Sequence, residues 1–238
     1  MTSREQPFRP WESATFFEVD GVPVIEELKA HWRELAAEYE RFKHLQTPYG
    51  LDEFYTGSWL TGAFRSHPLE LAAMTMDAKR AAVRSWFADG GSQASDAEID
   101  STYTKLWNMR EKRNRASCPL LTSILEPLYP ESCITYLYST MVPGTRISPH
   151  CGMNSDCVRV HLCLKEADNC WLNVRDEQRT WRNGQAWAFD DSSLHSAEHR
   201  GATDRAVLIV DFRKDAMERD LRELAARQAS PLEARGQA

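Results

Sequence analysis

The stretch that decides the fold begins as Met141-Val-Pro-Gly-Thr-Arg-Ile-Ser-Pro-His150-Cys-Gly152 and continues through Val158-Arg-Val-His161-Leu162. It ends in Phe189-Asp-Asp-Ser-Ser-Leu-His195 and Arg205-Ala-Val-Leu-Ile-Val-Asp211-Phe212. Its segments are rich in β-branched and aromatic residues and are separated by turn residues, which is typical of short strands. Three of the chain's seven histidines lie among them. We interpret the stretch as a metal site built on β-strands.

The composition describes an ordinary globular protein. The chain has 238 residues, of which 42% are hydrophobic and 27% charged, enough for one large domain. Its six cysteines form no CxxC pair, and no secretory leader precedes them, which predicts reduced thiols and a cytoplasmic location. The net charge of −6 argues against nucleic-acid binding. No apolar run approaches the roughly 18 residues of a spanning helix, so we expect no membrane partner either.

Hydrophobic periodicity divides the chain into a helical part and a β-rich part. It predicts helices over 23–42, 68–87, 95–113 and 214–227, with a short helix after Cys118. It predicts strands over 134–141, 157–164, 171–174, 185–189 and 205–212, with Asn183-Gly184 as a hairpin signal. Residues 50–65 are expected to form a loop with short strands.

These elements predict a single domain over residues 1–238, mainly β with flanking helices. Residues 1–130 form a mostly helical part packed on a barrel, 131–213 form the β core, and 214–238 form a C-terminal helix and tail. Short strands at regular spacing predict a sandwich or a barrel. The basic run at 110–115 either lies on a solvated helix face or attracts an acidic substrate or partner.

The strand predicted over 157–164 has two different faces. Successive side chains alternate, so four aliphatic residues share one face while Arg159, His161 and Cys163 share the other. The second face is either wet or lines a pocket, and a buried guanidinium would need an anion there. Arg205 opens another apolar strand and invites either a bound carboxylate or a salt bridge to Asp204 or Asp211.

His150 and His195 lie on different predicted strands and are the candidate metal ligands. His-x-Asp/Glu followed by a distant His is the facial triad of non-haem iron enzymes, but Gly152 stands where its carboxylate would be. Zinc held by Cys151, Cys157, Cys163 and histidines lacks the usual ligand spacing. The chain also contains no GxSxG elbow, P-loop or dinucleotide fingerprint.

Together these segments resemble the aspartyl/asparaginyl β-hydroxylases, which are Fe(II)- and 2-oxoglutarate-dependent oxygenases with a double-stranded β-helix (jelly-roll, cupin-like) core. The resemblance covers 133–212 and extends more weakly to 118–125 and 27–42. It implies that His150 and His195 bind the iron, and the family commonly has glycine at the position of Gly152. It implies that the cosubstrate is held by four residues, namely Ser139, Arg159, His161 and Arg205, with Arg205 on the distal carboxylate.

The resemblance implies a dioxygenase that uses O2 to hydroxylate a C–H bond of an amino-acid-type substrate and releases succinate and CO2. The substrate would be free, peptidyl or bound to a carrier protein. A related halogenase, a desaturase or cyclase, and a non-catalytic small-acid-binding barrel stay open as alternatives. Asp190 or Asp191 either orients His195 or caps a turn. His44 and His199 match nothing in the family and are expected at the surface, and Asp211-Phe-Arg-Lys replaces the family's Trp-His-Pro-like ending.

Overall fold

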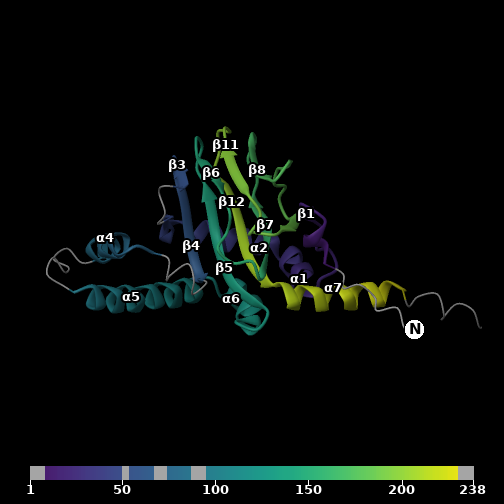
Figure 1. The fold of residues 1–238 in the computed structure, drawn as a ribbon, viewed down its shortest axis with the longest axis horizontal. Helices are drawn as coiled ribbons and strands as arrows, with labels where there is room; N and C mark the ends of the chain where they lie inside the picture. Colours follow the sequence, from purple (N-terminus) through teal and green to yellow (C-terminus); the bar gives the residue numbers. More distant parts are fainter. Residues whose placement is uncertain (1–8, 50–53, 67–73, 87–94, 230–238) are drawn as a thin grey trace, which may run out of the picture.

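The core consists of two antiparallel sheets that face each other (Figure 1), in a computed structural model that describes residues 9–49, 54–66, 74–86 and 95–229. The larger sheet has the order β1 (Phe16–Phe17), β10 (Ala186–Phe189), β7 (Cys157–Lys165), β12 (Arg205–Arg213), β5 (Cys133–Met141), β4 (Trp59–Arg65) and β2 (Thr47–Pro48). The smaller sheet has the order β3 (Tyr55–Thr56), β6 (Arg146–His150), β11 (His195–His199), β8 (Cys170–Val174) and β9 (Glu177–Arg179).

The order of β5 to β12 is that of a jelly roll, because consecutive strands alternate between the two sheets except at the β8–β9 hairpin, and the last strand returns beside the first. The predicted double-stranded β-helix core is therefore confirmed. The predicted faces of β7 are confirmed as well: Val158, Val160 and Leu162 pack in the cluster outside the large sheet, and Cys163 packs in the cluster between the sheets. The side chains between the sheets are the ones that can line a site.

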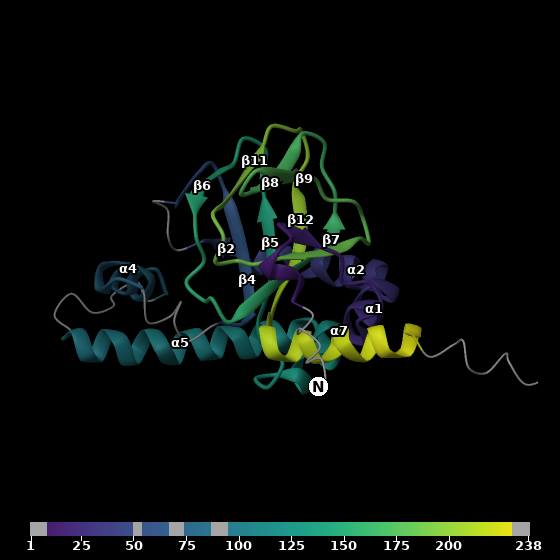
Figure 2. The same cartoon turned by 45° about the vertical axis from the view of Figure 1, so that its right-hand side comes forward.

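Helices cover the outer face of the large sheet (Figure 2). The α-helices are α1 (Pro23–Ala30), α2 (Trp32–Phe42), α4 (Met76–Trp86), α5 (Asp96–Ser117), α6 (Pro119–Leu125) and α7 (Lys214–Ala229), and the 3-10 turns are η1 (Pro10–Glu12), η2 (Lys43–Leu45) and η4 (Glu126–Leu128). The single helix predicted over 23–42 is wrong in one detail, since it breaks at His31 into α1 and α2. Tyr39 on α2 contacts Thr140 on β5 through their hydroxyls at 2.9 Å, which fixes the helix on the sheet.

The long helix α5 protects the outer strand β4. Arg110, Asn114 and Arg115 donate from α5 to the main-chain oxygens of Thr61, Ala63 and Phe64 along β4. Strand β2 pairs with β4 only at Leu60 and Thr61, so the bonds from α5 protect the rest of this strand edge. Arg110 and Arg115 of the basic run at 110–115 therefore bind the edge of the sheet. Within this run, only Lys112 and Arg113 are exposed.

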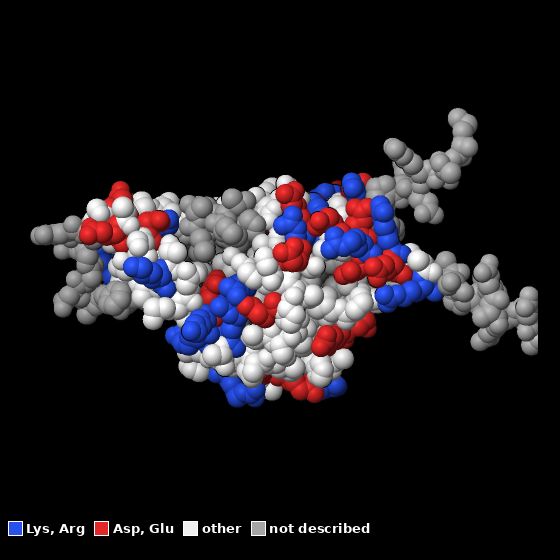
Figure 3. Space-filling model, turned by 90° about the horizontal axis from the view of Figure 1, so that it is seen from below, with Lys and Arg blue, Asp and Glu red and all other residues white. Residues whose placement is uncertain are grey.

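The far half of α5 stands out from the barrel with α4 packed along it (Figure 1). Ser95 and Glu98 form the capping box that opens α5, as the sequence indicates. Seen from below, acidic side chains gather at the outer end of this arm and basic ones lie further in (Figure 3), which complements the dipole of α5. The helix predicted over 68–87 is described only from Met74 onward, and residues 67–73 and 87 lie outside the described residues.

The hairpin predicted at Asn183-Gly184 is wrong. The amide of Gln185 donates to the oxygen of Arg182 at 2.9 Å, so the residues do form a tight turn. That turn leads from β9 in the small sheet to β10 in the large sheet. Gly184 has a φ of 76° and Asn183 has a negative φ, which fits a type II turn, whereas a two-residue type I′ hairpin needs positive φ at both positions.

No helix within the described ranges is both long enough and apolar enough to cross a membrane. All six cysteines are free thiols, and only Cys151 is exposed.

Candidate metal centre and cosubstrate pocket

His150 and His195 lie opposite each other on neighbouring strands. They are register partners in the antiparallel pair β6–β11, so their side chains project from the same face, and their ring centroids are 4.2 Å apart. The Nδ1 atom of His150 lies 2.8 Å from the oxygen of Ser148, and that of His195 lies 2.8 Å from the oxygen of Ser193. A carbonyl oxygen only accepts, so each Nδ1 carries the proton and each Nε2 keeps a lone pair for a metal.

Burial keeps His195 neutral. Burial, with the charge of His150 acting in the same direction, lowers the pKa of His195 from its ordinary 6.5 to about 3. The side chain is 6% exposed. A neutral imidazole is the form that binds iron or zinc, so His195 is ready to ligate at any physiological pH.

A carboxylate lies beside the two imidazoles although Gly152 has none. The Oδ1 atom of Asp191 is 3.5 Å from Nε2 of His195. A Cβ atom at Gly152 would lie 1.8 Å from Oδ2 of Asp191, and the amide of Gly152 donates to the oxygen of Asp191 at 2.8 Å. The triad position therefore has no room for a side chain, because a carboxylate from the loop before β11 occupies that space. Asp190 instead caps the turn through Ser192.

Arg159 joins the carboxylates at this end of the barrel. Its Nε and Nη2 atoms donate to the two oxygens of Asp211 at 2.7 and 2.8 Å. Its Nη1 atom lies 2.6 Å from Oδ1 of Asp191. Burial raises the pKa of Asp191, while the charge of Arg159 opposes that rise. The predicted cosubstrate ligand Arg159 thus lies in the pocket, close to His195, and is already paired with two acids of the chain.

Arg205 lies in the same sheet but in the opposite electrostatic setting. It is 3% exposed, and its Nη1 donates to the main-chain oxygen of Ser139 at 3.4 Å. Among the described residues no carboxylate pairs with it, and its Nε has no partner. The salt bridge to Asp211 weighed from the sequence is wrong, because Asp211 pairs with Arg159. Ser139 is buried beside it, and its Oγ accepts from Nε1 of Trp59 at 3.0 Å.

His161 lies between the two arginines. Burial lowers its pKa well below 6.5, and the charges of Arg205 and Arg159 act in the same direction. Its Nδ1 accepts from Nε1 of Trp181 at 3.2 Å, and its Nε2 is buried without a partner. The face of Trp181 also lies under Arg205, with 4.3 Å from the guanidinium carbon to the ring centroid. The sequence signal for Trp181, an aromatic residue before a turn, is too common to have identified it.

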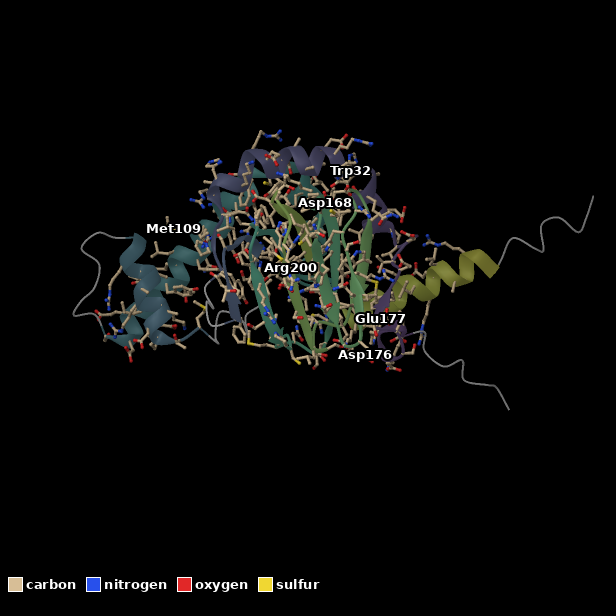
Figure 4. All side chains as sticks on the ribbon, turned by 90° about the horizontal axis from the view of Figure 1, so that it is seen from above. Trp32, Met109, Asp168, Asp176, Glu177 and Arg200 are labelled. Atoms are coloured by element: carbon tan, nitrogen blue, oxygen red, sulfur yellow. The ribbon has the colours of Figure 1, made fainter. Side chains whose placement is uncertain are left out.

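Two loops that touch each other close the barrel at its Arg205 end. The amide of Arg200 donates to the oxygen of Asn169 at 2.8 Å, and Gly201 packs directly on Asp168. Seen from above, Asp168 and Arg200 lie over the strands, while Asp176 and Glu177 mark the turn between β8 and β9 at the edge (Figure 4). Among the described residues, these two loops lie over the end of the barrel at which Arg205 is buried.

One histidine assignment from the sequence is wrong. His199 is 1% exposed, its Nε2 donates to the oxygen of Thr203 at 2.7 Å, and its Nδ1 accepts from the amide of Gly201 at 3.1 Å. It is buried because positions 195, 197 and 199 share the inner face of β11. His44 is exposed, as expected.

The donor set fits an Fe(II) site with two imidazole ligands. Within the described ranges no group of three His, Cys, Asp or Glu side chains is arranged to hold one metal ion. The zinc cluster of cysteines and histidines has no counterpart there, since Cys157 and Cys163 are buried and Cys151 is exposed. Nitrogen ligands with a carboxylate close by suit iron better than a thiolate-preferring metal.

Known proteins match the same region of the chain. The family model described as aspartyl/asparaginyl beta-hydroxylase matches residues 69–215. Aspartate beta-hydroxylase domain-containing protein 2 of Mus musculus is 36% identical over 111 residues, which are 42% of this chain and 31% of that protein. Aspartyl/asparaginyl beta-hydroxylase of Mus musculus is 37% identical over 75 residues, 31% of this chain and 10% of that protein.

A prolyl-4-hydroxylase of Pseudomonas putida is among the solved structures that are similar, with 13% identity and a TM-score of 0.41 over 81% of this chain and 97% of that one. The alignments span a third or less of the relatives' own lengths. The family match itself covers well over half of the chain and contains His150, His195, Arg159 and Arg205. The chain belongs to the aspartyl/asparaginyl β-hydroxylase family.

Proposed function

We propose that the protein is an Fe(II)- and 2-oxoglutarate-dependent dioxygenase that hydroxylates a C–H bond of an amino-acid-type substrate. One observation carries the proposal: two Nε2 lone pairs lie in register on β6 and β11, and two buried donors without a partner lie on β7 and β12. Those donors are Nε2 of His161 and Nε of Arg205. A bound metal would use the two lone pairs, and a bound anion would accept hydrogen bonds from the two donors.

2-Oxoglutarate suits this pocket because it carries a carboxylate at each end and a ketone beside one of them. Arg205 and Ser139 would hold the distal carboxylate at the closed end of the barrel. His161, and Arg159 closer to the histidine pair, would hold the 2-oxo acid end. Bound iron would supply the oxidative chemistry with O2, converting the cosubstrate to succinate and CO2. The chain itself fixes these groups and keeps water from the closed end.

Asp191 supports hydroxylation over halogenation. A halogenase of this class needs room for a halide where the triad carboxylate is missing. Here Oδ2 of Asp191 lies within 1.8 Å of where a Cβ of Gly152 would be. A halide would have to share that space with a carboxylate, and two negative charges so close repel each other strongly.

The family to which the chain belongs is named for aspartyl and asparaginyl groups, which supports an amino-acid-type substrate. A cavity of about 630 Å³ is lined by side chains of both signs, including Asp156, Arg175, Asp190 and Lys214, but by neither histidine. Lys214 and Asp190 pair with each other at 2.6 Å, so a substrate that used them would have to compete with this ion pair. A free, peptidyl or carrier-bound substrate and a cytoplasmic location belong to this proposal.

Product mass tests the proposal. The full chain is supplied with Fe(II), 2-oxoglutarate, O2 and a panel of amino acids and peptides rich in aspartyl and asparaginyl residues. We expect one product that gains a single oxygen atom, with succinate released in equal amount. A product that loses two hydrogen atoms would indicate a desaturase or cyclase, and a chlorinated product a halogenase. No iron-dependent succinate with any substrate would favour a non-catalytic binding barrel.

A further inference from the structure

Trp181 contacts both of the unpartnered donor groups in the pocket. The residue lies in the loop between β9 and β10 and is 2% exposed. Its indole N–H donates to Nδ1 of His161 at 3.2 Å. Its ring face lies 4.3 Å from the guanidinium carbon of Arg205. A single side chain thus controls the orientation of two side chains on different strands, β7 and β12.

The bond to His161 decides which nitrogen carries the proton. An indole N–H can only donate, so Nδ1 of His161 must be an unprotonated acceptor. A neutral imidazole with an unprotonated Nδ1 carries its proton on Nε2. Nε2 is the atom that is buried without a partner, so the proton points into the pocket as a free donor. With the proton on Nδ1 instead, Nε2 would present a lone pair and repel an anion.

The ring of Trp181 acts on Arg205 by a different interaction. An arginine over an indole face is attracted by the ring quadrupole, most strongly where water is excluded. Arg205 is buried and has no carboxylate partner among the described residues. The ring at 4.3 Å limits the movement of the guanidinium, and the Nε–H of Arg205 has no partner among the described residues. Both donors are therefore preorganised before any anion enters.

We propose that Trp181 is a positioning residue that holds His161 as its Nε2–H tautomer and Arg205 in a fixed plane, so that both donate to one bound dicarboxylate. The identity of that dicarboxylate as 2-oxoglutarate rests on the proposed function. The role of Trp181 itself concerns the chain alone, so it can be measured without iron, cosubstrate or turnover.

The first test reads the tautomer directly. Long-range 15N–1H NMR of the full chain without metal distinguishes the two ring nitrogens of His161, whose signals are identified by their loss in His161→Gln. We expect an Nε2–H tautomer in the wild type and a mixture of tautomers in Trp181→Phe, which keeps an aromatic ring but removes the N–H. Trp187→Phe is the matched control, because Trp187 also packs on His161, with 5.1 Å between ring centroids. An unchanged tautomer in Trp181→Phe would overturn the proposal.

The second test measures affinity. Calorimetric titration of 2-oxoglutarate into the Mn(II)-loaded chain should show about tenfold weaker binding for Trp181→Phe, equal to about 1.4 kcal/mol. In a His161→Gln background the amide can donate in either case, so adding Trp181→Phe should then weaken binding by less than about twofold. Equal losses in both backgrounds would mean a general packing defect and would contradict the proposal. If the wild type bound no 2-oxoglutarate, the proposed function would fail, while the tautomer test would still decide the role of Trp181.

Discussion

Two arginines of the large sheet, the partly buried Arg159 and the buried Arg205, face the barrel interior in opposite electrostatic settings. Arg159 lies close to His195 and has two acids of the chain around it, Asp211 and Asp191. Arg205 lies at the closed end and has no acid among the described residues; it contacts a carbonyl oxygen, the side chain of Cys170 and an aromatic face. The chain balances one charge internally and leaves the other for an anion from outside. Arg159 is therefore part of the internal structure of the site, whereas Arg205 is available to bind an anionic ligand.

The largest effect expected is loss of the metal. Replacing His150 or His195 by Ala removes one of two protein ligands, so iron-dependent succinate formation should fall to background. Metal content per chain, measured after dialysis against Fe(II), should fall with it. His199→Ala is the control: it should retain the metal but lower the free energy of unfolding by about 1–3 kcal/mol, because the oxygen of Thr203 and the amide of Gly201 lose their partner. Equal metal loss in all three variants would contradict the ligand assignment.

The second prediction sets the two arginines against each other. Arg159→Met leaves two buried carboxylates without their cation and should lower the free energy of unfolding by about 3–5 kcal/mol. Arg205→Met removes an unpaired buried cation and should leave the stability of the ligand-free chain unchanged or raise it. The same Arg205→Met variant should bind 2-oxoglutarate at least about 30-fold more weakly, about 2–5 kcal/mol, since a buried charge pair is lost. Similar destabilisation by both variants in urea unfolding would break the comparison.

The third prediction concerns pH and the imidazole between the arginines. The folded chain lowers the pKa of His161 well below 6.5, so below pH 6.5 the unfolded chain binds a proton that the folded chain does not. The free energy of unfolding should therefore fall with falling pH, by up to about 1.4 kcal/mol per pH unit for this group. His161→Gln should remove that part of the slope between about pH 6.5 and about pH 5. Parallel stability curves for wild type and variant would show that His161 titrates normally.

The smallest expected effect is a difference in cysteine reactivity, which tests which end of the pocket solvent can reach. Cys151 lies beside His150 and is exposed, whereas Cys163 and Cys170 lie near Arg205 and are buried. Burial raises the pKa of Cys163 to about 12, so almost no thiolate is present at neutral pH. Brief alkylation of the native chain should label Cys151 alone, as read by peptide mass spectrometry. Labelling of Cys163 at a comparable rate would show that solvent reaches the Arg205 end.

The sequence predicted the large sheet well and the small sheet poorly, for a physical reason. Strand β7 alternates between apolar and polar residues, and strand β12 is a continuous apolar run. Both patterns are visible in hydrophobicity alone. Strand β11, His-Ser-Ala-Glu-His, turns its two histidines inward, so its inner face does not look hydrophobic. His199 was placed at the surface because it matches nothing in the family, although it shares the buried face with His195.

The sequence could predict the site only where individual residues match the pattern of the family. The position of each candidate ligand in the sequence was sufficient to propose it. The contact between Gly152 and Asp191 joins two loops far apart in sequence, and only the fold shows why a glycine is required there. Trp181 likewise acquires its role from its position under Arg205 and against His161, which no local pattern encodes.

The most direct test of the central claim is an anaerobic titration of Fe(II) and 2-oxoglutarate into the metal-free chain, followed by visible absorption. It needs no knowledge of the substrate. The proposed function predicts the weak charge-transfer band of an iron–2-oxo acid chelate, present in the wild type, lost in His150→Ala and shifted to higher 2-oxoglutarate concentration in Arg205→Met. Metal binding without the band, or no binding of either ligand, would contradict the assignment of this pocket to an Fe(II)- and 2-oxoglutarate-dependent oxygenase.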